Sequence, residues 1–126
     1  LLQAMGRLDE AAPLGREALE AKRATLGDRH PHTLVSIGNL ADLVREQGRA
    51  DEARATLGDA AEAARATLGA EHLVTLVIDA KAARIALALG EGSAALAAAV
   101  ARLEAVLGAE HFQTRKYAAA LHASRP

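Results

Sequence analysis

The chain contains the stretch Leu26-Gly27-Asp28-Arg29-His30-Pro31-His32-Thr33-Leu34, which decides its fold because it returns twice. The second copy is Leu68-Gly69-Ala70-Glu71-His72-Leu73-Val74-Thr75-Leu76, and the third begins Leu107-Gly108-Ala109-Glu110-His111. The copies start 42 and then 39 residues apart. A period of this size is the signature of a repeat protein, in which each period is one supersecondary unit stacked on the next.

The glycines mark the same period. Gly6, Gly48 and Gly90 stand 42 residues apart, and residues 6–34 match residues 48–76 at 16 of 29 positions. Glycine directly after an apolar helical stretch is typical of a helix C-terminus, so each period is predicted to hold two helices. We therefore expect one repeat domain over residues 1–126, with approximate repeats 1–30, 31–72 and 73–111 and a partial repeat 112–126.

Apolar side chains recur at helical spacing in both halves of a period. Helices are expected over about 33–47, 51–68, 75–89 and 93–107, the last with Ser93 as N-cap, and a short one follows at about 113–123. Leu1 to Met5 is expected to be the last turn of a helix that ends at Gly6. Pro13 then falls near the first turn of the next helix, where the missing N–H of proline is tolerated.

The composition favours helices and excludes several functions. The chain has 33 Ala and 19 Leu, the strongest helix formers, so an all-α fold is predicted. A net charge of -1 and 2% aromatic residues argue against nucleic acid and against an anionic membrane surface. No apolar run approaches the roughly 20 residues that span a bilayer. The absence of cysteine and of a leader sequence favours a cytoplasmic location.

The chain resembles a known family at the residues that carry the period. Residues 26–34, the triplet Asn39-Leu40-Ala41, Gly48 and Glu52-Ala53 are similar to the tetratricopeptide repeats of kinesin light chain, and the resemblance covers essentially the whole chain. It implies a right-handed superhelical solenoid of antiparallel helical hairpins, whose concave face holds an extended peptide. In that family the triplet Asn hydrogen-bonds the ligand backbone, a role that falls here on Asn39; the third repeat has Lys81 at that position.

The candidate peptide-binding residues lie on the first helices of the hairpins, on the side away from the apolar stripe: Asn39, Asp42, Arg45, Glu46, Lys81 and Arg84. The cationic side chains favour an acidic peptide or a terminal carboxylate, whereas Asp42 and Glu46 oppose a uniformly basic groove. The alternative is an ordinary solvated helix face, on which Asp42, Arg45 and Glu46 are helical neighbours of mixed charge.

The histidines raise the question of a metal site. His30, His72 and His111 occupy equivalent positions, so the stack should separate them by one repeat each rather than bring them together around an ion. We therefore expect a structural role at the helix starts, and neither a metal nor a cofactor. The sequence also lacks a serine nucleophile elbow, a phosphate-binding glycine loop and a His-Glu-x-x-His motif, which predicts that the chain is not an enzyme.

These observations predict a protein-interaction scaffold that binds an extended or helical peptide segment of a partner. The alternative is a structural spacer or self-association arm of a larger regulatory protein, since interaction hot spots are rich in Trp, Tyr and Arg and this chain has few aromatic residues. The chain begins with Leu and is expected to be a segment of a longer protein. Apolar interfaces at its cut repeat ends would then favour self-association.

Overall fold

A computed structural model of the chain describes residues 2–124, with side chains from residue 5 onward. Within these residues it contains six α-helices and no strand: α1 (Leu2–Leu26), α2 (Pro31–Glu46), α3 (Ala50–Leu68), α4 (Leu73–Ala88), α5 (Ala94–Leu107) and α6 (Phe112–Ala123). The bounds agree with the sequence prediction to about two residues for all helices after α1, within the usual uncertainty of a helix end.

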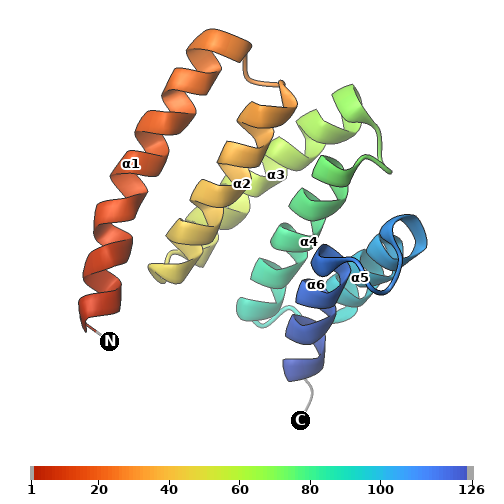
Figure 1. The fold of residues 1–126 in the computed structure, drawn as a ribbon. Coiled ribbons are helices and arrows are strands. Elements are labelled where there is room, and N and C mark those ends of the chain that lie inside the picture. The colour runs from red at the N-terminus through yellow and green to blue at the C-terminus, as the bar shows by residue number, and fades with distance from the viewer. Residues whose placement is uncertain (1, 125–126) are drawn as a thin grey trace.

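The helices stack as antiparallel pairs along one direction (Figure 1). Helix α4 contacts α2 on one side and α6 on the other, so these three helices form one layer. Helices α3 and α5 lie behind this layer. Within the described residues, no Cα atom of α3 lies within 8 Å of a Cα atom of α5. The chain is thus an all-α helical repeat solenoid, as the period predicts, and its two faces are built from different helices.

Histidine starts each helix of the front layer. His30, His72 and His111 have extended backbones, and their Nδ1 atoms accept hydrogen bonds at 3.1 Å from the backbone N–H two residues further on. Each bond satisfies one of the N–H groups that a helix start leaves free. The structural role predicted for these histidines is confirmed. At the other end of α2, Gly48 has φ +87°, a conformation that favours glycine and lets the chain turn back into α3.

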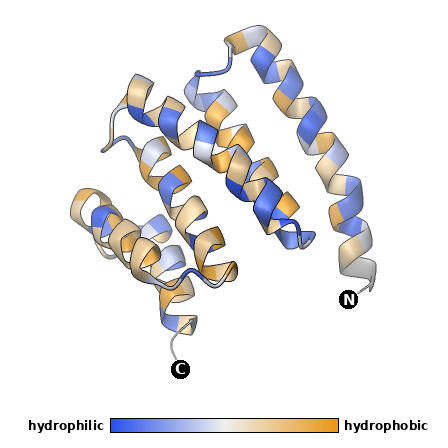
Figure 2. Cartoon of the chain, turned by 180° about the vertical axis from the view of Figure 1, so that it is seen from behind, coloured by the Kyte–Doolittle hydropathy of each residue, from blue (hydrophilic) through white to orange (hydrophobic). Residues whose placement is uncertain are grey.

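The core consists of aliphatic residues between the two layers. Leu34, Leu57, Leu76, Leu96 and Leu103 are almost fully buried, and alanines fill the spaces between the helices. Small side chains allow helix axes to approach closely, so the alanine content serves packing. Figure 2 shows α5 in mainly hydrophobic colours, while α3 alternates with hydrophilic residues. None of the helices within residues 2–124 has the length and hydrophobicity that crossing a membrane requires.

The first helix differs from the prediction. Helix α1 continues through Gly6 to Leu26 without a break, so the expected helix end at Gly6 is wrong; Leu1 lies outside the described residues. Gly48 ends a helix because the next helix folds back onto α2, whereas the described residues contain no helix before Gly6 onto which α1 could fold. Pro13 consequently lies inside α1, where its ring cannot donate a hydrogen bond to the carbonyl of Asp9. Ser93 does occupy the N-cap position of α5, but its side chain makes no capping hydrogen bond there.

Candidate functional site

A cavity of about 250 Å³ opens on the front layer, between α2, α4 and α6. Apolar side chains from two helices line it, among them Val35, Leu73 and Val77. Val35 and Leu73 are each 43% exposed, so the cavity has a hydrophobic rim that solvent reaches. Its polar lining consists of Asn39, Asp42, Lys81, Gln113 and Lys116. This combination of apolar surface and a few polar groups is typical of a binding site.

An ion pair joins two of the helices beneath this cavity. The ammonium group of Lys81 on α4 binds the carboxylate of Asp42 on α2, and only 8% of the Lys81 side chain is exposed. Gly38 makes room for it, because a Cβ atom at Gly38 would lie 3.3 Å from both Cδ and Cε of Lys81. The aliphatic stem of Lys81 therefore packs directly on the backbone of α2, and its charge is compensated by Asp42.

Lys116 on α6 is the cation of the cavity that solvent reaches. Within the described residues it makes no ion pair, and its Nζ lies 5.3 Å from the ring centroid of the buried Tyr117. Partial burial, followed by the positive charges of Lys81, Arg84 and Arg45, lowers the pKa of Lys116, while Asp42 opposes this shift. The cavity thus has a positive potential at Lys116, which an anionic group would relieve.

The predicted site residues divide into two groups. Asn39, Asp42 and Lys81 line the cavity together, whereas Arg45, Glu46 and Arg84 do not. Arg45 instead lies 3.6 Å from Glu46 on the same helix. Lys81 was expected on the exposed side of its helix, and this is wrong, because the space above Gly38 buries it against α2. Asn39 is exposed at the cavity.

Sequence reasoning missed Gln113 and Lys116, which α6 contributes to the cavity. The Oε1 atom of Gln113 is buried and has no hydrogen-bond partner in the described part of the chain. The repeat register could have found Lys116, since the 42- and 39-residue steps align it with Val77 and Val35, which line the same cavity. A lysine in place of the valine found in the other two repeats marks this position as one that differs from its equivalents, which is the signal for a candidate functional residue.

The histidines do not converge, because each caps a different helix. In the residues that the structure describes, no group of three or more His, Asp or Glu side chains could hold a metal ion.

Comparison with known proteins identifies the architecture. A search of curated proteins finds no match to the chain. The tetratricopeptide repeat family matches residues 1–66, which is just over half of the chain and includes α1, α2 and most of α3. Its members are non-catalytic helical repeat scaffolds that generally mediate protein–protein interaction. With this match and with six stacked helices that carry the repeat, the chain belongs to the tetratricopeptide repeat family.

Proposed function

We propose that the cavity between α2, α4 and α6 binds an extended, acidic peptide segment of a protein partner. The observation that carries this proposal is the combination of an exposed hydrophobic rim with amide side chains and an unpaired lysine. An extended peptide leaves its backbone N–H and C=O groups unpaired, and Asn39 and Gln113 can supply a donor and an acceptor to them. A carboxylate of the peptide would meet Lys116.

Lys116 carries the charge preference. Its pKa is lowered by burial and by neighbouring cations, so its charged form is destabilised until an anion arrives. Lys81 cannot serve in the same way, since Asp42 already compensates its charge. The groove therefore favours one acidic group close to α6 rather than a uniformly acidic ligand.

The long period also supports a closer classification. We infer that the repeats are of the kinesin light chain type, because the stretch Leu-Gly-x-x-His recurs with spacings of 42 and 39 residues and each of the three copies forms the same capped loop. Nothing in the proposed peptide binding depends on this classification.

A display selection of peptides on the chain tests the proposal. The variants Asn39→Ala and Lys116→Gln remove exposed groups and should leave the fold intact. Arg115→Gln is the matched control, since it removes a charge from the same helix at a residue that does not line the cavity. We expect acidic peptides with a shared motif, lost in the first two variants and retained in the control. Absence of a motif, or equal enrichment on all variants, would favour a structural spacer or self-association arm instead.

A further inference from the structure

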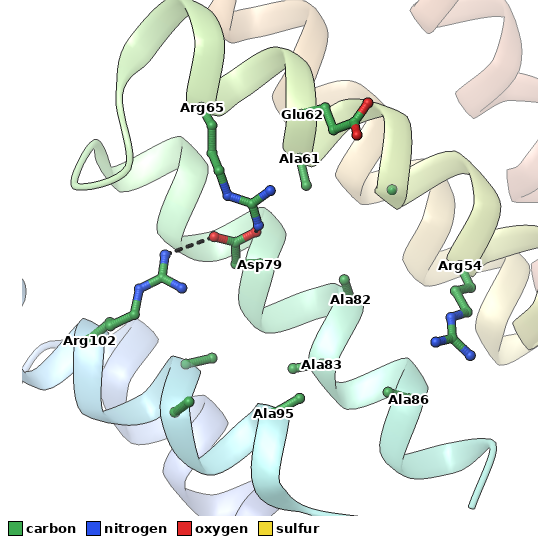
Figure 3. A pocket seen from close by; sticks show the side chains of 13 residues that line it. Arg54, Ala61, Glu62, Arg65, Asp79, Ala82, Ala83, Ala86, Ala95 and Arg102 are labelled. Carbon is green, nitrogen blue, oxygen red and sulfur yellow. Dashed lines mark hydrogen bonds and ion pairs between the residues drawn. The ribbon is translucent and has the colours of Figure 1, made fainter. Parts of the chain in front are cut away.

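The back of the molecule has a second cleft, between α3 and α5, with α4 as its floor (Figure 3). Its volume is about 560 Å³, roughly twice that of the front cavity. Within the described residues no Cα atom of α3 lies within 8 Å of a Cα atom of α5, and residues of α4 line the cleft between the two helices. The apolar lining consists of small side chains: Ala61, Ala82, Ala83, Ala86, Ala95, Ala98 and Ala99.

The preceding repeat has an equivalent cleft that is smaller. The cleft between α1 and α3, over α2, has a volume of about 340 Å³. The 42-residue step aligns Ile37 with Asp79 and Leu40 with Ala82. Two large aliphatic side chains of α2 are thus replaced on α4 by a carboxylate and a methyl group. The larger cleft is a departure from the repeat rather than a consequence of stacking.

Asp79 holds two arginines at one end of this cleft. Its carboxylate accepts a hydrogen bond from Nη2 of Arg65 on α3 at 2.5 Å and from Nη2 of Arg102 on α5 at 2.8 Å. Figure 3 marks the bond to Arg102 with a dashed line and shows the Arg65 side chain reaching toward the same carboxylate. Asp79 is only 8% exposed, whereas the arginine side chains are 49% and 45% exposed. Each guanidinium group has five N–H donors, so most of them stay available.

At the ion-paired cluster itself two guanidinium groups share the one carboxylate of Asp79, and the remaining positive charge is offset in part by Glu62, which precedes Arg65 by three residues on α3. Arg54, at the opposite end, is already held by both carboxylate oxygens of Glu91. Glu62 also lines the cleft, and it makes no ion pair within the described residues. An anionic group of a ligand would therefore bind at Arg65 and Arg102, and Glu62 would oppose it.

The lining favours a helix over an extended peptide as the occupant. Between its charged side chains the cleft is lined by alanine and Gly58 alone, so the backbone of an extended segment would lose its hydrogen bonds to water along this part without replacement. An α-helix satisfies its own backbone, and small residues allow its axis to approach to about 8–10 Å. The exposed side of α5 is also apolar, since its fourteen residues include only two charged ones, Arg102 and Glu104.

We propose that the α3–α5 cleft is a second docking site, which binds an acidic amphipathic α-helix of a protein partner. The helix lays its small apolar side chains on the alanine floor and directs Asp or Glu side chains to Arg65 and Arg102. Arg54 and Arg65 are eleven residues apart on α3, so the cleft is about 16 Å long, or three helical turns. This site is independent of the peptide groove on the front layer.

A synthetic helix serves as the probe. It is an alanine-based peptide of about 18 residues with a pair of Glu residues one turn apart, compared with a twin in which Gln replaces both. Binding is measured by fluorescence anisotropy, and amide shifts of the labelled protein locate it. We expect shifts at Ala82, Ala98 and Arg102, and affinity for the Gln twin weaker by about tenfold.

Four variants test the cleft directly. Arg102→Gln should weaken binding by about tenfold, and Glu62→Gln should strengthen it by about two- to fivefold. Ala98→Leu fills the cleft at an exposed position of α5 and should abolish binding, whereas Ala101→Leu, on the same helix but outside the cleft, should not.

The proposal is overturned by any of four outcomes. These are no binding at millimolar peptide, equal affinity for the Gln twin, indifference to Ala98→Leu, and shifts confined to Asn39 and Lys116 on the front layer. Equal shifts with free glutamate would identify a simple anion site, and shifts that depend on protein concentration alone would identify a second copy of the chain; both also contradict a partner helix. If binding at the α3–α5 cleft fails these tests, the proposed peptide binding in the cavity between α2, α4 and α6 still stands, since its test uses other residues.

Discussion

Three buried threonine hydroxyls offer a test of how the repeats are stabilised. Thr33, Thr75 and Thr114 stand at the same position of α2, α4 and α6 and are 0–2% exposed. Their Oγ1 atoms have no hydrogen-bond partner within the described residues. Valine has nearly the same shape as threonine and the same preference for a helix, so Thr75→Val removes the hydroxyl and little else.

The expected gain follows from the cost of an unpaired polar group. A buried hydroxyl without a partner costs about 1–3 kcal/mol, so Thr75→Val should raise the free energy of unfolding by at least about 1 kcal/mol. With an unfolding entropy of about 2.1 cal/mol/K per residue, 1 kcal/mol in a chain of 126 residues is a rise in Tm of about 4 °C. Thr33→Val lies in another repeat, and its gain should add to the first.

Thermal and urea unfolding followed by circular dichroism measure the effect. Thr67→Val is the matched control, because the exposed hydroxyl of Thr67 donates to the carbonyl of Ala63 at 2.7 Å, and its stability should change by less than about 0.5 kcal/mol. A loss of stability in Thr75→Val would refute the reasoning. It would mean that the buried hydroxyl is hydrogen-bonded in solution and that the recurrent threonine stabilises the repeat through this bond.

Three further predictions concern other positions. Gly58→Ala in α3 should stabilise the chain by about 0.5–1 kcal/mol, because a Cβ atom there meets nothing within 4 Å; an unchanged urea midpoint would contradict this. Ala41→Leu should destabilise the chain by about 1–3 kcal/mol through overpacking, since Ala41 is 1% exposed in the core. A lower urea midpoint would show this loss of stability. Burial and the charge of Asp42 raise the pKa of Tyr117 above its ordinary value of 10.0, so the folded chain keeps a proton that the unfolded chain loses. Stability should therefore fall as pH rises past 10, and unfolding curves of Tyr117→Phe should lack this part of the decline.

Local signals made most of the fold predictable. The loop Leu-Gly-x-x-His works through its own residues: the histidine caps the helix that follows, and the glycine accommodates a positive φ. No distant contact is needed, so the period alone locates the helices. The failure at Gly6 has the opposite cause. Whether a glycine ends a helix depends on a neighbouring helix that draws the chain back, and the sequence match between Gly6 and Gly48 carries no information about that neighbour.

The candidate site was harder to predict because it depends on contacts between repeats. Sequence periodicity placed Asn39 correctly at an exposed position of the front layer, but the burial of Lys81 depends on the missing side chain of Gly38 on another helix. Helical spacing within α4 cannot reveal that space. The same holds for Gln113 and Lys116, which reach the cavity only because α6 stacks on α4.

Some of the positions that recur in this chain are ones that stacking requires. Leu34 and Leu76 are buried and the three recurring histidines cap helices, whereas Arg23 and Arg65 also recur and are not buried. Departures from the repeat line the two cavities: Lys116 stands in place of Val77, and Asp79 in place of Ile37. A charged group at a position that stacking keeps apolar costs stability unless it is paired, and Asp79 is paired by two arginines. Asp79 thus tolerates its buried position through this pairing, and its carboxylate holds Arg65 and Arg102 together at the cleft between α3 and α5.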